Sequence, residues 1–365
     1  MAQHYRLGQF FRQRYTNNTK LIPATYNASE IVIRSTDVDR TLMSAQANLA
    51  GWFPPPNSDQ FKDGFPWQPI PVHTRPQAED YELVTFASCP KAEKALKDKL
   101  ASPEIQQEEK QNHEFYEFVS NKTGVPNEGI ASIWEIYDTF LCEKDHNLTL
   151  PQWVTEKWNQ TGETIFDKMR KLDATEFTLS SDGPVLRRLR GGPLLKEMIG
   201  RMQQYSEGKL KASPKVFVYS AHDTTVAALL ATLGVYNGKL PPYAAAVMLE
   251  LYQTAKGPAV KVVFRNDSVP TVEPQELHTL VINGCTPLCP LEKFQSLMKD
   301  VLPGDWHREC QLSPPSIFSR KFIIILSSVA GVVLLVVIAT AALCYLRHKR
   351  RRYSSYWGLT TDATI

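Results

Sequence analysis

The sequence predicts an α/β domain with a mixed central sheet flanked by helices, because apolar runs of strand length alternate with helical patterns. Glu30–Ser35 and Val216–Ser220 are the first two such runs, and the second has the composition of a strand buried on both faces. Helical periodicity follows each run, over Arg40–Trp52 and Thr225–Leu233. Two strand-to-helix junctions of this kind are typical of α/β sheets.

A long, polar and helical region separates two pieces of this domain. It extends from about Ala92 to Met202, and two further strands, Val247–Tyr252 and Val260–Arg265, follow it. We therefore expect an α/β domain at 1–74 and 208–310, a helical insertion at 75–207, a stalk at 311–321, a transmembrane helix at 322–346 and a cytosolic tail at 347–365.

The C-terminal region predicts a single-pass type I membrane protein. Phe322–Leu346 is an uninterrupted apolar stretch, longer than the roughly 20 residues that cross a bilayer. The basic cluster Arg347–Arg352 follows at once, and the positive-inside rule keeps such a cluster in the cytosol. Tyr356–Leu359 matches an endocytic sorting pattern that favours the lysosome, with the cell surface as the alternative location.

Sequons and cysteines agree with that orientation. Asn-x-Ser/Thr triplets, of which chance would give about two, begin at Asn17, Asn27, Asn121, Asn147, Asn159 and Asn266. The cysteines on the same side are Cys89, Cys142, Cys285, Cys289 and Cys310, while Cys344 lies in the apolar stretch. An oxidising compartment would allow two disulfides and leave one odd thiol. Met1–Tyr15 reads as an amphipathic helix without the apolar core of a signal peptide, so we expect the natural N-terminus to lie upstream.

Composition and motifs give no support to several functional classes. The net charge is only +3, and no basic stripe interleaved with aromatic residues favours nucleic-acid binding. The chain contains neither Gly-x-Ser-x-Gly nor His-Glu-x-x-His. None of its eight histidines forms a pair at the helical spacing of metal ligands. Serine hydrolase, zinc protease and metal-centre interpretations therefore lack support.

The segment Ala221–Thr225 (AHDTT) is the first candidate site. It follows the strand Val216–Ser220, at the carboxyl end where α/β sheets bind ligands and where helix N-terminal amides favour anions. His222 and Asp223 would stand at this junction. In the structural alternative, Asp223 or Thr224 caps the next helix and His222 is a satisfied buried imidazole.

The segment Arg34–Thr41 (RSTDVDRT) is the second candidate, again between a strand and a helix. Its structural alternative is a capping turn whose arginines pair with carboxylates. Arg40 argues against that alternative, because the macrodipole disfavours a cation in the first helical turn and a bound anion would resolve the conflict. If the two junctions are neighbours, Arg40, His222 and Asp223 converge in a set that suits phosphate-ester cleavage.

Both junctions, together with the stretches LMSAQANLAGWFPP, WQPIPVHT, IYDTFLCE and YNGKLPPYA, resemble the histidine acid phosphatases of the lysosomal and prostatic-type branch. The resemblance extends from Met1 to about Cys310. It implies hydrolysis of phosphate monoesters at acidic pH in two steps, through a phosphohistidine, without a metal or other cofactor.

The resemblance also implies roles for individual residues. Arg40 and His222 would bind the substrate phosphate, and Asp223 would donate the proton. The implied disulfides join Cys89 to Cys310 and Cys285 to Cys289. Trp67 and His73 lie in a segment that helps to form the dimer contact of prostatic-type relatives, so a homodimer is a further expectation.

Two departures from the family pattern stand out. The family nucleophile is the histidine of an Arg-His-Gly-x-Arg-x-Pro motif on the first strand, and this sequence contains no such motif. Gln3–Tyr5 matches the helix that follows that strand, so His4 is not the nucleophile, and we expect the first strand to be missing. Ala246 replaces the cysteine that would pair with Cys142, which leaves Cys142 free or linked elsewhere.

Two other functions compete with this interpretation. Asp37–Thr41 fits Asp-x-Asp-x-Thr, the signature of magnesium-dependent haloacid-dehalogenase-type phosphatases, in which Asp37 would attack and Asp39 would act as the acid. Alternatively, a glycosylated ectodomain without its nucleophile could be an inactive, membrane-anchored binding module.

Overall fold

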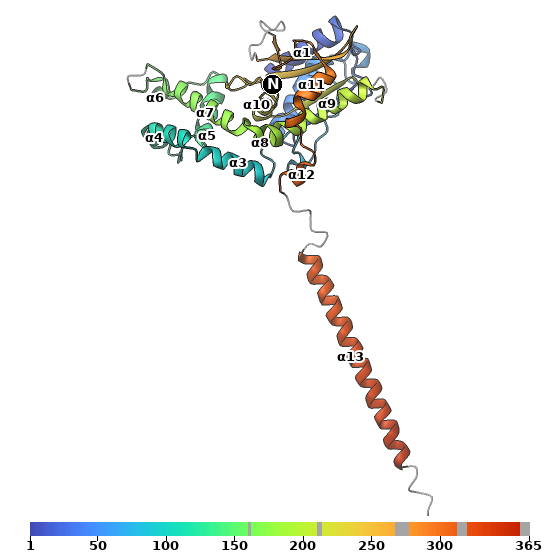
Figure 1. Ribbon diagram of the computed structural model, residues 1–365. Coiled ribbons are helices and arrows are strands. Elements are labelled where there is room, and N and C mark those ends of the chain that lie inside the picture. The colour runs from blue at the N-terminus through green and yellow to red at the C-terminus, as the bar shows by residue number, and fades with distance from the viewer. Residues whose placement is uncertain (160–161, 210–213, 267–276, 312–319, 358–365) are drawn as a thin grey trace, which may run out of the picture. The chain divides into compact units, whose positions relative to one another are not determined.

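The computed structural model describes residues 1–159, 162–209, 214–266, 277–311 and 320–357 (Figure 1). Met1–Leu312 form one compact unit, and Ser313–Ile365 form a second. The first unit contains every candidate site residue, and it is an α/β unit in which helices flank β-strands. The α/β prediction is therefore confirmed.

Two sheets form the centre of the first unit. In one sheet, β1 (Ile31–Ser35) and β2 (Val216–Ser220) pair in parallel, with Ser35 opposite Ser220. In the other sheet, β3 (Ala246–Thr254) and β4 (Gly257–Arg265) form an antiparallel hairpin, and β5 (His278–Leu280) and β6 (Cys289–Pro290) pair with β4.

The expectation of one continuous mixed sheet needs correction. Among the described residues, β2 pairs with β1 alone and β3 pairs with β4 alone, so the parallel and antiparallel parts are separate sheets. All five residues of β2 are half-exposed, although the run was expected to be buried on both faces. The physical reason is that no described strand lies against the second edge of β2.

Helices α1 (Ala2–Phe11) and α2 (Asp39–Trp52) cover one side of the β1–β2 pair, and a π-helical segment, Arg12–Asn18, continues α1. The two helices pack closely because glycines face the partner backbone. A Cβ atom on Gly8 would lie 1.9 Å from the carbonyl oxygen of Asn48. The predicted amphipathic helix at the start of the chain therefore packs into the domain.

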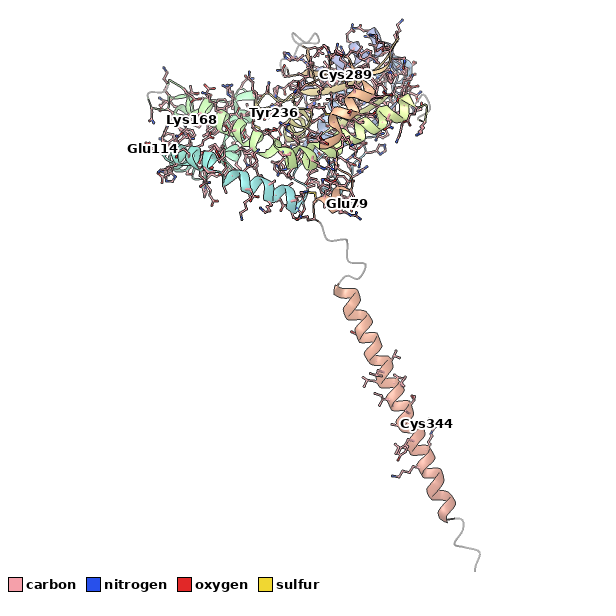
Figure 2. All side chains as sticks on the ribbon, viewed as in Figure 1. Glu79, Glu114, Lys168, Tyr236, Cys289 and Cys344 are labelled. Carbon is pink, nitrogen blue, oxygen red and sulfur yellow. A yellow bond between two sulfur atoms is a disulfide. The ribbon has the colours of Figure 1, made fainter. Side chains whose placement is uncertain are left out.

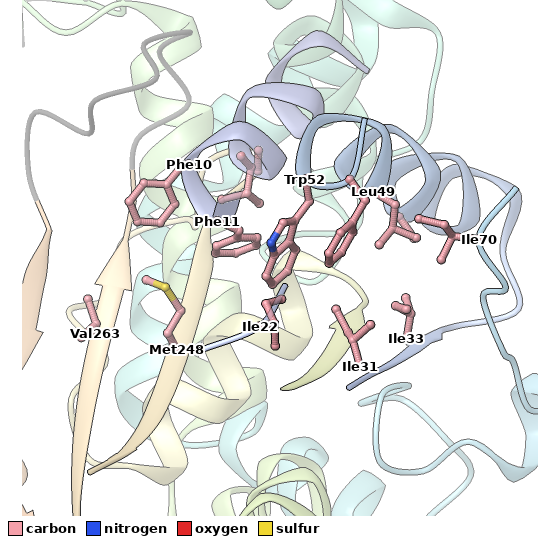
Figure 3. Packing of buried hydrophobic residues seen from close by; sticks show 14 residues of the cluster. Phe10, Phe11, Ile22, Ile31, Ile33, Leu49, Trp52, Ile70, Met248 and Val263 are labelled. Atoms are coloured by element: carbon pink, nitrogen blue, oxygen red, sulfur yellow. The ribbon is translucent and has the colours of Figure 1, made fainter. Parts of the chain in front are cut away.

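A hydrophobic cluster lies beneath α1 and α2 (Figure 3). The rings of Phe11 and Trp52 pack at 4.9 Å between centroids, tilted by 44°, and Trp52 is 1% exposed. Ile31 and Ile33 of β1 reach the cluster from one side, and Met248 of β3 reaches it from another (Figure 3). Both sheets therefore contribute to a shared core.

The described residues of the region predicted to be a helical insertion contain helices and no named strand. Its helices are α3 (Pro90–Leu100), α4 (Pro103–Thr123), α5 (Ile133–Asp145), α6 (Gln152–Thr155), α7 (Ile165–Ser181), α8 (Pro184–Leu186), a π-helical turn at Arg187–Gly191 and α9 (Gly192–Ser206). Helices α4, α5 and α7 bury a core of their own, which includes Phe115, Ile133 and Met169. The exact boundaries 75 and 207 stay a prediction.

The remaining α-helices of the first unit follow β2 and β6. They are α10 (Asp223–Thr232), α11 (Leu291–Met298) and α12 (Trp306–Glu309). Short 3-10 turns lie between α2 and α3, at Asn57–Asp59 and Gln77–Glu79, and after α11, at Lys299–Val301. Helix α10 carries the AHDTT junction at its start. Its interior is almost wholly buried, from Ala227 to Thr232, which fixes that start in place.

Two disulfides link distant and local parts of the first unit. Cys89, before α3, is bonded to Cys310 across 221 positions of sequence, and Cys285 is bonded to Cys289 (Figure 2). These are the pairs that the family resemblance implies. Cys142 is a free thiol in the structure, as is Cys344.

The second unit contains α13, Arg320–Trp357, which includes the expected span 322–346. Within the described residues, no helix is both long and apolar enough to cross a membrane. Within the expected span, the side chains of 322–327, 329 and 330 lie outside the described part of the chain. Most of the expected stalk, at 312–319, and the end of the tail, at 358–365, lie outside it too.

Candidate active site

The parallel pairing of β1 and β2 brings the two candidate junctions together. Both strands end at the same edge, and the hydroxyl of Ser220 donates a hydrogen bond to the carbonyl oxygen of Thr41 at 2.8 Å. His222 follows β2 and contacts both Thr36 and Arg40 of the other junction. The convergence expected from the sequence is therefore present in the structure.

Two contacts fix the imidazole of His222. Its Nδ1 lies 3.3 Å from Nη2 of Arg40, and its Nε2 lies 3.1 Å from the hydroxyl oxygen of Thr36. A guanidinium group only donates hydrogen bonds, so Nδ1 accepts and the ring proton is on Nε2. Burial lowers the pKa of His222, and the charge of Arg40 lowers it further. The free site thus favours a neutral imidazole.

Arg40 is exposed and lies in the first turn of α2, directly after Asp39. Within the described part of the chain, it makes no ion pair with a carboxylate, and His222 is its side-chain partner. A cation at this end of a helix opposes the macrodipole. An anion between Arg40 and the helix terminus would compensate both positive charges.

Asp223 is the first residue of α10, and its Oδ1 accepts a hydrogen bond of 2.7 Å from the backbone amide of Thr224. The residue at the N-cap is His222, so the alternative in which Asp223 or Thr224 occupies the cap is wrong. Burial raises the pKa of Asp223, and the neighbouring Asp138 adds to that effect. The carboxyl therefore retains its proton to a higher pH than a free aspartic acid.

A cavity of about 2020 Å³ opens at these residues, and Arg40, His222 and Asp223 line one part of it. Asp223 is exposed to this space, yet the walls around it still remove much of its hydration, which is why its pKa rises. The cavity can admit a substrate beside a cation, an imidazole and a carboxyl whose pKa is raised.

Comparison with known proteins agrees with this geometry. Residues 1–265 match the model of the histidine phosphatase superfamily, branch 2. The chain belongs to the histidine phosphatase superfamily. It is 39% identical over 341 residues to lysosomal acid phosphatase of Rattus norvegicus, a match that covers 93% of this chain and 77% of the relative. It is 40% identical over 320 residues to prostatic acid phosphatase of Bos taurus, covering 86% and 78%.

Solved structures with a similar fold include phytases. The chain superimposes on a Hafnia alvei phytase in complex with myo-inositol hexakis sulphate with a TM-score of 0.62, at 18% identity, covering 86% of this chain and 88% of the phytase. A Klebsiella phytase gives a TM-score of 0.59 at 20% identity, with the same coverage. At these identities, the likeness establishes a shared fold alone.

Membership of the histidine phosphatases leaves the magnesium-dependent alternative without support. Asp37 and Asp39 are exposed and do not line the cavity. Asp37 contributes its backbone carbonyl to a hydrogen bond from Gln77 at 2.8 Å. In the described part of this histidine phosphatase, no group of three His, Cys, Asp or Glu residues is placed to hold a metal ion.

Arg34 has a different role from Arg40 in this histidine phosphatase. It is 8% exposed and forms ion pairs with Asp80, with Glu82 at 2.7 Å and with Glu197 at 3.3 Å. The structural alternative, arginines paired with carboxylates, is therefore correct for Arg34 and wrong for Arg40.

His4 lies in the wall of the same cavity. Burial lowers the pKa of His4 to about 4, and the positive N-terminus adds to the effect. Its backbone carbonyl accepts a hydrogen bond from Asn48 at 3.3 Å. Nothing in these contacts joins His4 to the Arg40–His222 pair.

The sequence analysis missed an acidic wall beside Asp223. Asp138, Asp173 and Glu176 line the cavity, and Asp173 is only 4% exposed. Burial raises the pKa of Asp173 to about 8 and that of Glu176 to about 7, with repulsion among the carboxylates as the second cause for Asp173. These residues come from α5 and α7, so no local motif reveals them; the acidic positions on amphipathic helices were the only signal.

Proposed function

We propose that this histidine phosphatase hydrolyses phosphate monoesters at acidic pH through a phosphohistidine intermediate. This proposal rests on one observation. Arg40, His222 and Asp223 lie together at one edge of the β1–β2 pair, in the wall of a large cavity. The names of its relatives, lysosomal and prostatic acid phosphatase, support the same reaction.

In the proposed first step, a nucleophilic imidazole attacks phosphorus while the bond from phosphorus to the ester oxygen breaks. Arg40 and His222 hold the phosphoryl oxygens, and Asp223 gives its proton to the leaving oxygen. In the second step, Asp223, now a carboxylate, accepts a proton from the water that attacks the phosphohistidine. Inorganic phosphate is released and the nucleophile is regenerated.

The raised pKa of Asp223 supports an acidic working range. A proton donor must be protonated when the ester bond breaks, and burial keeps Asp223 protonated above the usual range of an aspartic acid. As the pH rises through the pKa of Asp223, the donor is lost and the rate falls. Replacement by Asn should remove the donor at every pH and lower kcat most for substrates with poor leaving groups.

In this proposal the nucleophile is the histidine of an Arg-His-Gly-x-Arg-x-Pro motif, which these 365 residues do not contain. The same fact supports a second candidate function, a phosphate-binding module without turnover. An assay with a chromogenic aryl phosphate separates the two functions. It compares this chain with a form extended upstream by a strand that carries the motif.

Under the phosphatase proposal, the extended form turns over substrate and the short form binds inorganic phosphate with little or no turnover. Full activity in the short form would refute the assigned nucleophile. No activity in a folded extended form would favour the binding module.

We further propose that 322–346 anchors the protein in a membrane as a type I protein, in the lysosome or on its route. The apolar run and its basic flank support this proposal. On the outer side, five of the six sequon asparagines are exposed and Asn266 is partly exposed, so glycans would have room. The full chain should stay in the membrane pellet after alkaline extraction, and a form without 322–346 should be released. Release of both forms would refute the anchor.

A homodimer is the last part of the proposal. Phe61, Phe65 and Trp67 form an aromatic cluster with ring centroids 5.6 to 6.1 Å apart, and Phe61 is 65% exposed. Exposed aromatic clusters of this kind favour protein contacts. Light scattering should give a molar mass twice that of one chain. The double variant Phe61→Ser, Trp67→Ser should lower the measured mass toward that of one chain. A monomeric parent would refute the dimer.

A further inference from the structure

The acidic wall of the cavity, formed by Asp138, Asp173 and Glu176, has no role in the proposed phosphate chemistry. Asp138 is exposed on α5, whereas Asp173 is 4% exposed on α7. Although Asp173 lines the cavity, its Oδ1 accepts no hydrogen bond from any described residue. Buried carboxyl oxygens are normally hydrogen-bonded, so this oxygen is open to a partner that enters the cavity.

A second unpaired polar group lies near the same carboxyls. The hydroxyl of Tyr236 is buried and has no hydrogen-bond partner within the described part of the chain. Burial raises the pKa of Tyr236, and the charges of Asp173, Glu176 and Asp223 raise it further. The carboxyl of Asp173 and the hydroxyl of Tyr236 can each accept a hydrogen bond. Their vacancy indicates that this part of the cavity lacks a donor.

The cations near the acidic wall have other partners. Arg170 lines the same cavity, but it pairs with Asp167 at 2.9 Å. Arg190 faces Glu176, where its charge opposes without outweighing the burial that raises the pKa of this carboxyl to about 7. Among the described residues, neither aspartate of the acidic wall forms an ion pair. The two aspartates therefore have no cation of their own.

The charges of the cavity change sign from one side of Asp223 to the other. Both Asp138 and Arg40 act on the carboxyl of Asp223, whereas the charges that act on Asp173 are carboxylates. Asp223 thus lies between the cationic side of the cavity and the acidic wall. In the proposed reaction, Asp223 protonates the leaving oxygen. The group attached to that oxygen would then extend toward the acidic wall.

We propose that Asp138 and Asp173 bind a primary ammonium group carried by the leaving group of the substrate. This inference rests on the proposed function, because it places the phosphate at Arg40 and His222. An ammonium group offers a positive charge and three hydrogen-bond donors, so it can pair with Asp138 and fill the vacant acceptor of Asp173. A metal ion fits less well, since no group of three His, Cys, Asp or Glu residues in the described ranges is placed to hold one.

Binding of non-hydrolysable phosphonates to the full chain tests this inference. The probes are aminoalkylphosphonates with chains of three and six carbon atoms. Each has a neutral match in which a hydroxyl replaces the ammonium group, so both members of a pair present the same phosphonate to Arg40 and His222. Titration calorimetry at pH 8 should show that one amino probe or both bind roughly tenfold more tightly than the match.

The preference for the amino probe should depend on pH. Burial raises the pKa of Asp173 to about 8, and the repulsion from neighbouring carboxylates adds to the effect. At pH 5 this carboxyl is protonated and attracts a cation less, so the preference should fall below about threefold. A preference that persists unchanged at pH 5 would contradict the role of Asp173.

Variants separate the acidic wall from the general charge of the cavity. The double variant Asp138→Asn, Asp173→Asn should lower the preference at pH 8 below about threefold and leave binding of the neutral match unchanged. Asp145→Asn is the matched control, because Asp145 is an exposed residue of α5 that lines the same cavity. It removes the same kind of charge and should keep the preference.

Equal binding of the amino probes and their matches at pH 8 would overturn the inference and leave the phosphate site intact. An equal loss of preference in Asp145→Asn and in the double variant would also overturn it. If the double variant does not fold, the pH dependence in the parent decides. If no phosphonate binds, the proposed phosphate site fails, and n-butylammonium decides: a rise in the midpoint of thermal unfolding of the parent, absent from the double variant, supports the ammonium site, and no rise refutes it.

Discussion

Arg34 and Arg40 lie six positions apart on either side of one strand end, and they have opposite environments. Arg34 is buried among Asp80, Glu82 and Glu197, whereas Arg40 is exposed beside the ring of His222. A buried cation with three carboxylates is already compensated and serves the fold. An exposed cation without a carboxylate, at a helix N-terminus and in a cavity wall, can compensate an incoming anion.

The largest expected effect concerns Arg34, the buried arginine that is paired with carboxylates. Arg34→Met should lower the free energy of unfolding by about 3–5 kcal/mol, because it leaves buried carboxylates without their cation. Denaturant unfolding of the parent and variant measures the change. A loss below about 1 kcal/mol would show that the carboxylates around Arg34 are solvated or protonated and do not need it.

The second prediction concerns Arg40, the exposed arginine in the cavity wall. Arg40→Ala should weaken binding of inorganic phosphate by about 10- to 100-fold, the loss expected for a charged hydrogen bond of about 1.5–3 kcal/mol. Its free energy of unfolding should change by less than about 0.5 kcal/mol. Titration calorimetry measures the affinity. Unchanged affinity together with a large loss of stability would reverse the roles assigned to the two arginines.

The third prediction uses the acidic wall near Asp223. The pKa of Asp173 is raised to about 8, so the unfolded chain releases this proton at lower pH than the folded chain does. Stability should therefore fall as the pH rises from about 4 to 8. Asp173→Asn should reduce that fall by about 1 kcal/mol or more, since 1.36 kcal/mol corresponds to one pKa unit.

Unfolding curves at several pH values measure the effect of Asp173→Asn. Asp63→Asn is a suitable control, because Asp63 is an exposed carboxylate and should leave the pH dependence unchanged. The same pH dependence in the Asp173→Asn variant as in the parent would mean that Asp173 is already ionised in the folded protein.

The smallest expected effect comes from Arg75, which pairs with Glu82 from an exposed position, with 46% of its side chain accessible. Arg75→Met should cost about 0–1 kcal/mol, because an exposed ion pair is screened by solvent. The same denaturant experiment measures it. A cost equal to that of Arg34→Met would show that exposure does not distinguish the two arginines.

The elements around Arg34 and Arg40 could largely be predicted from local sequence. The strands β1 and β2 and the helices after them are encoded by short apolar runs and helical periodicity, which act within a few residues. Arg40 was identified because a cation in a first helical turn conflicts with the helix dipole. Each of these signals lies within a few neighbouring residues, so a single sequence is enough to detect it.

Other features depend on contacts between distant segments. The partners of Arg34 at Asp80 and Glu197 lie 46 and 163 positions away, so the sequence could not separate its role from that of Arg40. Asp173 reaches the cavity only because α7 packs near α10. The division into two sheets was also missed, because an apolar run predicts a strand but does not show which of its edges is paired.

The most direct test of the central claim is a crystal structure of this chain with inorganic phosphate. The account predicts a phosphate within hydrogen-bond distance of Nη2 of Arg40 and of the imidazole of His222, with Asp223 beside it. Arg34 should keep its three carboxylate partners unchanged. A phosphate bound elsewhere in the cavity, with Arg40 and His222 still in contact with each other alone, would contradict the assignment of this site.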